Sequence, residues 1–383
     1  MKLKKSYFFL FVLTLLTFDF SAQSALQNSG NIQIHQDGQM GFHIDLVNNG
    51  TFNQNLGLAG FYHTSNELTI SGTETPRFFD IEVDVVNHLF LDINTEVANS
   101  VAYINGDVIT PRNNPNISLD YLENAFYVLE SSTTNTDGYA SFNGNVEFSF
   151  PIGNDDKLRP LITTNNTPRT FIKAAYFNED PNFPSVFNNG FNTSTTDAFV
   201  NNVSTIEFWD FDGPNNSLVT LTWDSESNIN SLVSELQSLR VVGWHIVDQE
   251  WKDLGNSNFT GTFNEGTIDS FIFNPSDYEI ITFGALITED DLNIYNLFSP
   301  NSDGTNDTFV IEGIELFENT LKIYNRWGNI VYEITNYQND WDGTSNAGRV
   351  VRRNQKLPAG TYYYTLELTN SGKATTGWLY INY

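Results

Sequence analysis

The chain has 383 residues, with 46 Asp and Glu against 18 Lys and Arg, and it contains no cysteine. The lack of cysteine excludes disulfides, cysteine nucleophiles and thiolate metal sites, so burial and sheet hydrogen bonding must hold the fold. Of the acidic residues, 33 lie between residues 23 and 287 against eight basic ones, and a surface of that charge repels nucleic acid and anionic lipid.

Residues 1–22 have the pattern of a secretory signal peptide. Lys2, Lys4 and Lys5 form a positive segment, and the apolar run from Tyr7 to Leu16 is too short to span a bilayer. Small residues at positions 21–24 offer a cleavage site. We therefore expect this segment to direct export.

Residues 23–162 are predicted to form a β-solenoid. Short strands with period-two alternation lie between Asn/Gly corners such as Asn49-Gly50 and Ser71-Gly72, at intervals of about twenty residues. The inward-pointing candidates are Ile32, Ile34, Met40, Phe42, Ile44, Leu68, Ile70, Ile81, Val83, Val85, Val101 and Tyr103. The spacing is irregular, so a β-sandwich is the alternative. Residues 76–110 and 138–160 are loosely similar to the central and closing segments of solenoids in Bacteroidetes surface proteins.

Residues 163–286 have longer strands and are predicted to form a β-sandwich with one short helix. Apolar residues recur at helical spacing, and residues 225–228 are available to cap the helix. These apolar residues are Ile229, Leu232, Val233, Leu236 and Leu239. The tryptophans Trp209, Trp223, Trp244 and Trp251 suit a sandwich core, and stacking against sugars is the alternative. Residues 287–296 are then an acidic linker to a last domain at 297–383.

The last domain contains five sequence blocks in a fixed order. They are Ser299–Asp307 (SPNSDGTND), Leu321–Gly328 (LKIYNRWG), Trp341–Gly343 (WDG), Leu357–Tyr364 (LPAGTYYY) and Gly377–Tyr383 (GWLYINY). This order resembles the gliding-motility-associated C-terminal domain of Bacteroidetes, the type B sorting domain of the type IX secretion system. The resemblance implies export across the outer membrane and display on, or release from, the cell surface. It also implies two partners, the type IX translocon and an outer-membrane β-barrel of the PorP/SprF type.

The same residues predict a small antiparallel sandwich, immunoglobulin-like in outline. Tyr362, Tyr364, Leu366 and Leu368 share one face of an alternating strand, and glycine-containing turns separate the short runs. The whole chain is therefore expected to be all-β.

Several residues of this domain are candidates for sorting or partner binding. Trp327 and Trp341 are expected in its core, where their loss would impair export. The docking face is expected to include either the aromatic residues of the last strand or a basic loop, because aromatic and arginine side chains carry most interface energy. The aromatic candidates are Trp378, Tyr380 and Tyr383, and the basic ones are Arg349, Arg352, Arg353 and Lys356. Ordinary solvated charge is the alternative for the loop.

Residues 301–312 suggest one cation site. Asn301, Asp303, Thr305 and Asp307 present side-chain oxygens at every second position, and Glu312 lies where a twelve-residue calcium loop has its closing carboxylate. Such a loop needs glycine at its sixth position, which here is asparagine. The alternative is an Asx-turn network in which these side chains bond to nearby backbone amides.

Catalytic motifs are scarce. The five histidines form no HExxH pair, and no Gly-x-Ser-x-Gly sequence or phosphate-binding loop occurs. Asp80, Glu82 and Asp84 would form an outward row on one strand, suited to calcium or to acid/base work, but a solvated strand face explains them more simply. We therefore predict no catalytic or cofactor-binding residues and no enzyme.

Three classes of function remain. The first is a cell-surface protein associated with the outer membrane, with a structural or adhesive role or as an accessory subunit of a gliding-adhesin-like assembly. The second is a surface-displayed carbohydrate-binding module, which exposed aromatic residues in a row would favour. The third is a solenoid enzyme that degrades glycans, which a cleft joining Asp80, Glu82 or Asp84 to a basic residue would favour.

Overall fold

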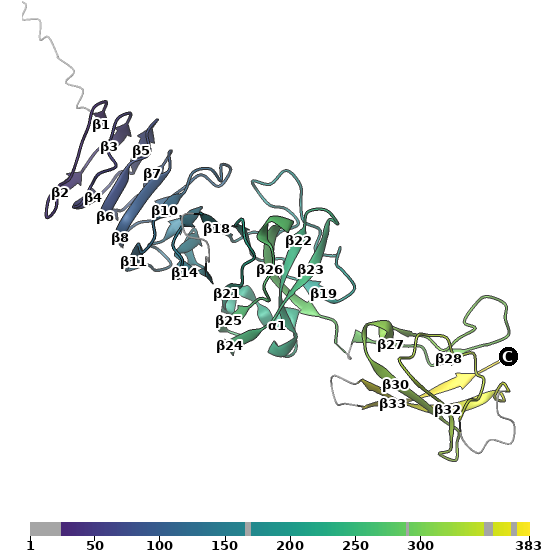
Figure 1. Cartoon of the computed structure of the whole chain (residues 1–383). Helices are drawn as coiled ribbons and strands as arrows, with labels where there is room; N and C mark the ends of the chain where they lie inside the picture. The colour runs from purple at the N-terminus through teal and green to yellow at the C-terminus, as the bar shows by residue number, and fades with distance from the viewer. Residues whose placement is uncertain (1–23, 165–169, 289–290, 348–354, 369–373) are drawn as a thin grey trace, which may run out of the picture. The chain divides into compact units, whose positions relative to one another are not determined.

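The computed structural model describes residues 24–164, 170–288, 291–347, 355–368 and 374–383 (Figure 1). These residues form strands with only a few short helical turns, so the chain is all-β as predicted. Two compact units divide between Tyr139 and Ala140. The predicted signal peptide at 1–22 lies outside the described residues.

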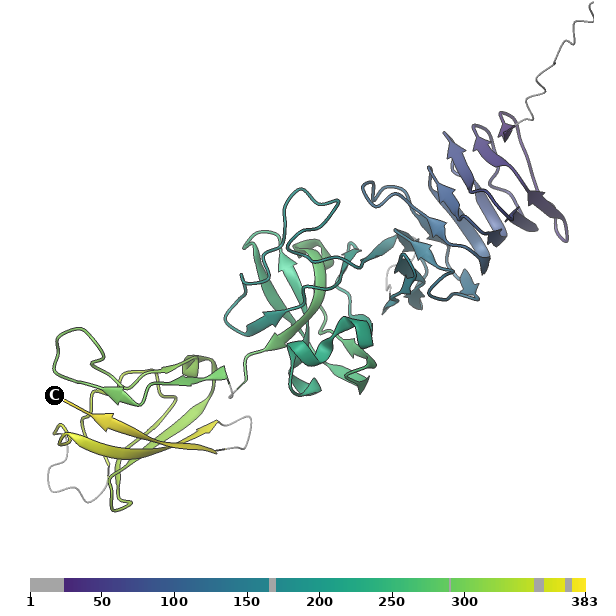
Figure 2. The same cartoon turned by 180° about the vertical axis from the view of Figure 1, so that it is seen from behind.

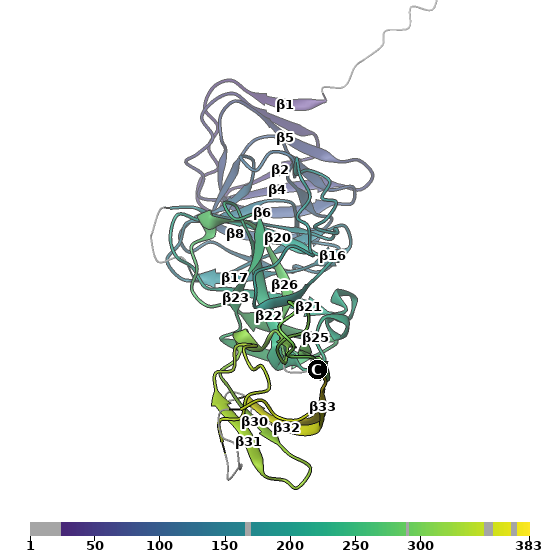
Figure 3. The ribbon, with the colours of Figure 1, turned by 90° about the vertical axis from the view of Figure 1, so that its right-hand side faces the viewer.

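The first unit is a β-solenoid with two parallel sheets. The chain returns to each sheet in turn, so that successive strands stack side by side (Figure 3). One sheet contains β1 (Ala25–Asn28), β3 (Asp45–Asn48), β5 (Leu68–Gly72), β7 (Leu89–Leu91), β9 (Val108–Ile109) and β12 (Thr136–Asp137). The other contains β2 (Gln39–Phe42), β4 (Leu58–His63), β6 (Arg77–Val85), β8 (Thr95–Asn105) and β10 (Leu119–Tyr121), and β11 (Phe126–Val128) also pairs with β8.

Alternating side chains fill the solenoid core. Phe42 and Phe61 are partners in the β2–β4 register, and their rings stack with centroids 4.8 Å apart. Phe52, in the loop before β4, packs edge-on against Phe78 of β6, with ring centroids 5.2 Å apart. Most of the predicted inward residues are buried, but the prediction for Ile44 is wrong, because it follows the end of β2 and is 38% exposed.

Asparagine and glycine hold the corners of the coils. Asn48 is fully buried, accepts a hydrogen bond from Nδ2 of Asn28 at 2.7 Å and donates one to the carbonyl of Glu74 at 2.6 Å. Gly72 has φ of 127°, and a Cβ there would lie 2.1 Å from the carbonyl oxygen of Asn48. Only glycine fits this corner, because neighbouring coils approach at backbone distance.

The second compact unit begins at Ala140, before residue 162, where the sequence placed the end of the solenoid domain. β13 (Ala140–Phe142) pairs with β18 (Ile172–Phe177), and β17 (Leu161–Thr164) pairs with β21 (Val219–Asp224). Residues 140–162 therefore contribute strands to the second unit.

The first part of the second unit, here called the middle domain, has two sheets with mainly antiparallel pairing. One has the order β13, β18, β20 (Phe208–Asp212), β26 (Tyr278–Leu286), β22 (Leu239–His245) and β23 (Glu250–Gly255), with β19 (Val200–Val203) also on β26. The other has the order β14 (Glu147–Phe150), β17, β21, β25 (Glu265–Asp269) and β24 (Asn258–Thr262), and β15 (Ile152–Asn154) forms a hairpin with β16 (Lys157–Leu158). Trp223 of the second sheet packs edge-on against Phe283 of the first at 6.0 Å, so the two sheets share a core.

The predicted helix is much shorter than its apolar pattern indicated. α1 spans only Ile229–Leu232, between the 3-10 turns η1 (Ser225–Ser227) and η2 (Leu236–Ser238), and η3 (Pro275–Asp277) precedes β26. Val233 is extended, with φ of −135°, and ends the helix. Ile229, Val233 and Leu239 are nevertheless buried, because the segment packs as a loop rather than as a helical face.

The last domain has a five-stranded sheet, seen from behind in Figure 2 with its final strands in yellow. The strand order is β28 (Leu297–Phe298), β33 (Ala374–Ile381), β32 (Gly360–Leu368), β30 (Asn319–Tyr324) and β31 (Ile330–Thr335). β27 (Asn293–Ile294), which falls in the predicted linker, pairs with β29 (Ile311–Glu312), and the turn η5 (Ile314–Leu316) follows. Tyr362, Tyr364, Leu366 and Leu368 are buried together, as predicted.

A buried arginine connects the two sheets of the middle domain. The Nε atom of Arg159 donates to Glu207 at 2.9 Å, and its two terminal nitrogens bind the carboxylate of Asp224 at 2.6 and 2.9 Å. Tyr176 donates to the same Glu207 oxygen at 2.6 Å. The guanidinium therefore binds one oxygen of a carboxylate in the core and both oxygens of another at the end of β21.

The pKa values of this cluster follow from its burial. Burial and the adjacent charge of Glu207 raise the pKa of Tyr176, so its hydroxyl remains a hydrogen-bond donor. Although burial opposes it, Arg159 holds the pKa of Asp224 below its ordinary value. This pair therefore stabilises the fold at neutral pH, and its contribution is lost as the pH falls through the folded-state pKa of Asp224.

We expect Arg159→Leu to lower the free energy of unfolding of the middle domain by about 3–5 kcal/mol, because Glu207 would be left buried without its counter-ion. Urea unfolding of the whole chain, followed by tryptophan fluorescence, measures the change. The double variant Arg159→Leu/Glu207→Leu should recover part of the loss. The exposed pair of Arg77 and Glu96 is the control, since Arg77→Leu should cost about 1 kcal/mol or less. Equal losses from the two single variants would contradict the assigned role of Arg159.

Candidate functional site

The last domain holds most of the predicted functional residues, and its buried face is organised around Trp341. The indole is 2% exposed, lies 5.4 Å from the ring of Phe298 and 5.1 Å from that of Tyr332, and donates from Nε1 to the carbonyl of Thr344 at 2.8 Å. Burial raises the pKa of Tyr332 to about 12. Trp341 is therefore a core residue, as predicted.

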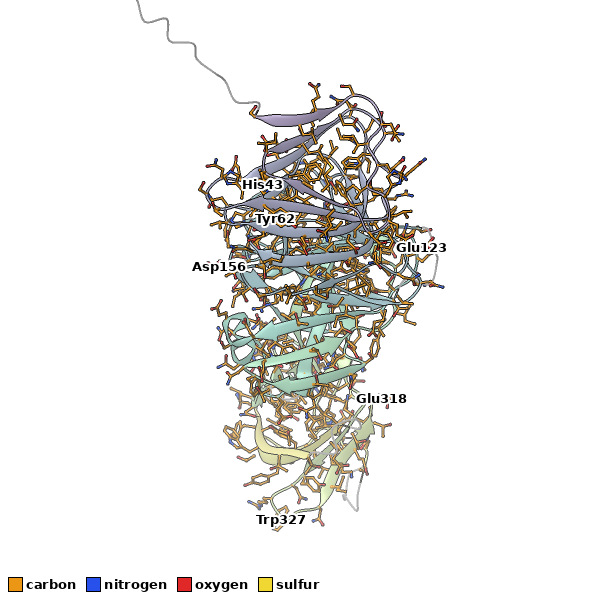
Figure 4. The ribbon with its side chains drawn as sticks, turned by 90° about the vertical axis from the view of Figure 1, so that its left-hand side faces the viewer. His43, Tyr62, Glu123, Asp156, Glu318 and Trp327 are labelled. Carbon is orange, nitrogen blue, oxygen red and sulfur yellow. The ribbon has the colours of Figure 1, made fainter. Side chains whose placement is uncertain are left out.

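The prediction that Trp327 lies in the core is wrong. Trp327 occupies the turn between β30 and β31, is 69% exposed, and is contacted by the guanidinium of Arg326 at 4.2 Å (Figure 4). The turn is formed by Asn325, whose side-chain oxygen accepts the amides of Trp327 and Asn329, and by Gly328 with φ of 76°. These turn requirements place the indole in solvent.

The outer face of the five-stranded sheet carries a continuous group of exposed apolar side chains, here called the outer aromatic face. Strand register places Leu297 beside Tyr380, and Trp378 beside Tyr363. These four side chains are between 38% and 61% exposed. The sequence had identified Trp378 and Tyr380, but it missed Leu297 and Tyr363, because only the pairing of β28, β33 and β32 brings the four together.

Tyr383 and Lys356 lie outside that register. Tyr383 is about half exposed, and its hydroxyl donates to the carbonyl of Leu357 at 2.5 Å. Lys356 donates to the carbonyl of Pro300 and lies 4.0 Å from the carboxylate of Asp342. Arg349, Arg352 and Arg353 lie outside the described residues, so the loop remains a sequence-based prediction.

The candidate calcium loop is closed by hydrogen bonds of its own. The two oxygens of Asp307 accept the amides of Ser302 at 2.6 Å and Gly304 at 2.8 Å. Asp303 accepts Nδ2 of Asn301 at 2.9 Å and the amide of Thr305 at 2.8 Å, and these bonds hold the pKa of Asp303 below its ordinary value. Such bonds are those of an Asx-turn network.

Glu312 contacts groups other than the carboxylates of that loop. It lies on β29 and accepts Nδ2 of Asn293 at 3.1 Å and the hydroxyl of Tyr295 at 2.7 Å. Within the part of the chain that the structure describes, no group of three or more His, Cys, Asp or Glu side chains is placed to hold a metal ion. The calcium site therefore stays a prediction.

The solenoid carboxylates face outward, as their alternation predicted. Asp80 and Glu82 line an open groove of about 620 Å³ on the outer face of the sheet that contains β6. Asp80 accepts hydrogen bonds from Asn99 at 2.6 Å and Ser100 at 2.5 Å. None of the described residues that line the groove is basic.

Glu82 is held by a tyrosine of the preceding coil. Its carboxylate accepts the hydroxyl of Tyr62 at 2.5 Å, and burial together with that bond raises the pKa of Tyr62 to about 12. Tyr62 crosses the space above Gly60, where a Cβ would lie 2.0 Å from its hydroxyl oxygen. His43, which directly follows β2, lies beside Tyr62 (Figure 4), with Nδ1 3.1 Å from the carbonyl oxygen of Tyr62.

The fold and these surfaces define an all-β protein with a solenoid, a middle domain of two sheets and a last domain with one exposed aromatic face. Residues 292–381 match the family model of the CHU_C type IX secretion signal domain. The chain therefore carries a C-terminal sorting domain of Bacteroidetes proteins, as the motif order implied. No curated protein and no solved structure matches the chain.

The sorting domain indicates that the protein interacts with the type IX secretion machinery and is exported to the cell surface or the extracellular space. Among the described residues, no helix combines the length and apolar character needed to cross a membrane. The family match begins at residue 292, five residues before the predicted start of the sorting domain at residue 297. The earlier start agrees with the structure, because β27 already pairs with β29 of this domain.

We expect Trp341→Ala to lower the free energy of unfolding of the sorting domain by about 3–5 kcal/mol, because a large buried ring would leave a cavity. Trp327→Ala should change it by about 0.5 kcal/mol or less, because the exposed indole buries little area. Chemical unfolding of the whole chain compares the two variants. Similar losses from both would show that Trp327 contributes to the core after all.

Asp307→Ala should lower the melting temperature by a similar amount in calcium and in chelator, because its carboxylate already binds two backbone amides. Differential scanning calorimetry in the two buffers measures the difference. Thr308→Ala is a neighbouring control, because its side chain has no hydrogen bond to another described residue and its backbone φ is not positive. A loss confined to the calcium buffer would instead support the calcium loop.

Proposed function

We propose that the protein is a non-enzymatic cell-surface protein with a structural or adhesive role, acting alone or as an accessory subunit of a gliding-adhesin-like assembly. The sorting domain directs it outward, and the solenoid and middle domain are the exported cargo. Those two parts together hold an extended parallel sheet surface and a loop-rich sandwich, which suit binding. The acidic surface from 23 to 287, with 33 acidic and eight basic residues, keeps this cargo soluble.

The second part of the proposal concerns the outer aromatic face. We propose that this face docks on an outer-membrane β-barrel of the PorP/SprF type and keeps the protein at the outer membrane after export. One side of the same sheet faces the domain core, where Leu379 and Ile381 of β33 are buried. The opposite side of that strand leaves Trp378 and Tyr380 exposed. Large aromatic side chains that the fold does not need are typical anchors of protein interfaces.

A binding role fits the solenoid carboxylates better than catalysis does. Asp80 is engaged by Asn99 and Ser100, and Glu82 by Tyr62, so both carboxylates serve as hydrogen-bond acceptors between coils. An acid/base pair needs two carboxyl groups that are free to exchange protons with a substrate, whereas these two are engaged by neighbouring side chains.

We expect residues 292–383, fused behind a signal peptide and an unrelated cargo, to be sufficient for secretion and surface retention in a host with a working type IX system. Trp378→Ser with Tyr380→Ser in that fusion should lower the cell-bound fraction at least about tenfold, because interface aromatic residues contribute most of the binding energy. Fractionation of cells and medium, followed by immunoblotting, measures both results.

The control for this experiment is Glu367→Gln with Thr375→Ala, two exposed changes on the neighbouring strands of the same sheet. Point changes are preferable to removal of residues 376–383, because that deletion would take away most of β33 and unfold the sheet. Complete retention of the unmodified fusion in the periplasm would contradict sorting by this domain. Normal secretion with an unchanged cell-bound fraction in the aromatic variant would contradict docking through the outer aromatic face.

A further inference from the structure

The middle domain contains a pocket of about 470 Å³ that none of the features above uses. Three segments form it: the loop between β18 and β19, the hairpin between β22 and β23, and the start of β26. Its lining combines aromatic rings with amide and carboxylate side chains. The residues that carry the argument are Phe187, Asn188, Asn189, Trp244, Gln249 and Glu279.

Trp244 forms the aromatic wall and is held from below by other rings. It packs edge-on against Phe191 and against Trp251, with centroids 5.7 Å apart in both cases. The register of β22 against β26 shifts between Gly243 and His245, so a bulge occurs at Trp244. Bulges redirect side chains, and this one leaves Trp244 half-buried in the pocket wall rather than fully in the core.

The loop that forms the opposite side is held in one conformation by its own hydrogen bonds. Both carboxylate oxygens of Glu179 accept from Ser185, one from the backbone amide and one from the hydroxyl, each at 2.7 Å. Asn182 accepts the amide of Thr193 at 3.0 Å. A Cβ at Gly190 would lie 2.0 Å from the carbonyl oxygen of Asn182, so glycine is needed where the loop closes. A preformed wall lowers the entropy cost of binding.

The polar side chains of the pocket are free to bind a ligand. Asn188, Asn189, Gln249 and Glu279 are exposed, and none of their side chains hydrogen-bonds to another residue in the described parts of the chain. Each amide offers two donors and an acceptor, and the carboxylate offers acceptors. A hydroxyl group both donates and accepts, so this set matches a ligand rich in hydroxyls.

The aromatic wall and the charge of the site narrow the class of ligand. A pyranose has an apolar C–H face that packs on an indole, while its hydroxyls reach amides at the ring edge. The lining includes Glu279 and no basic residue, so an anionic sugar would be repelled. The volume falls within the range of about 300–1,000 Å³ that is typical of small-molecule sites.

We propose that this pocket binds a neutral hexose unit of a glycan, with the sugar ring against Trp244 and its hydroxyls bonded to Asn188, Asn189 and Gln249. The inference deepens the proposed adhesive role by naming the class of ligand, and in that respect it rests on the proposed function. Binding by the purified chain does not depend on export, so the two can fail separately.

The test is isothermal titration calorimetry of the purified full chain with maltotetraose, cellotetraose and fully N-acetylated chitotetraose, and with tetragalacturonate as an anionic comparison. We expect at least one neutral tetrasaccharide to bind with a dissociation constant between about 10 µM and 1 mM. Asn188→Ala with Asn189→Ala should weaken that binding at least about tenfold. The thermal unfolding transition should not move, because these exposed amides have no partners in the described chain.

Three further variants make the result specific. Trp244→Phe should weaken binding several-fold while a ring still packs on Phe191. Glu279→Gln should leave neutral-sugar binding within about threefold, because the amide still accepts a hydrogen bond. Gln237→Ala removes an exposed amide outside the pocket and should have no effect.

The proposal is overturned if no neutral tetrasaccharide binds the folded chain at about 5 mM, which is weaker than a useful adhesive contact. It is also overturned if tetragalacturonate is preferred, or if binding is unaffected by the Asn188/Asn189 variant. Loss of neutral-sugar binding in Glu279→Gln would also overturn the proposal, because the amide keeps the acceptor that a sugar hydroxyl needs.

Discussion

Backbone pairing between neighbouring strands is the interaction on which every part of this chain depends. There is no disulfide, and the helical turns are too short to carry a core. Pairing fixes the register, and the register divides side chains into an inner and an outer set. Phe42 and Tyr364 belong to the inner set, whereas Glu82 and Trp378 belong to the outer one. The inner set holds the fold together, so contacts with other molecules are left to the outer set and the loops.

The two outer surfaces differ in chemistry because their strands meet different neighbours. On the solenoid sheet, Glu82 lies opposite Gly60 of the preceding coil, and the space above that glycine admits the ring of Tyr62. Polar groups thus find partners within the sheet. On the sorting domain, Tyr363 lies opposite Trp378, and both rings remain exposed. The polar groups of the solenoid surface find hydrogen-bond partners within the solenoid, whereas the surface of the sorting domain leaves apolar side chains exposed.

Sequence alone predicted the all-β class, the solenoid and the sorting domain, because period-two alternation and glycine corners are local signals. It failed where distant segments decide the outcome. The apolar pattern from Ile229 to Leu239 suited a helix, but the segment ends α1 at Val233 and enters β22. Trp327 is a different case, because its cause is local: it was predicted to be a core residue, but a tight turn with Gly328 places it in solvent.

Sequence-based prediction of the functional surfaces was limited in the same way, because some of their residues come together only in the folded domain. Trp378 and Tyr380 could be identified from the alternation of a single strand, whereas Leu297 joined them only through a parallel pairing across the whole domain. The pocket beside Trp244 could not be predicted, since it needs a β-bulge and a loop that starts after β18. Tryptophan content suggested both a core and a sugar-stacking role, and three of the four middle-domain rings are buried.

The parallel pairing of β28 with β33 has a consequence for the order of folding. Phe298 and Ile381 are register partners, although almost the whole domain lies between them. Contacts between residues so distant along the chain form slowly, because the loop-closure entropy must be overcome first. The solenoid coils pair with neighbours only about twenty residues away and can form earlier. A copy cut short within β33 would leave β28 and β32 with open edges and no intact sorting domain. A chain without β33 therefore lacks the strand that joins β28 to β32, and its sorting domain cannot form the five-stranded sheet.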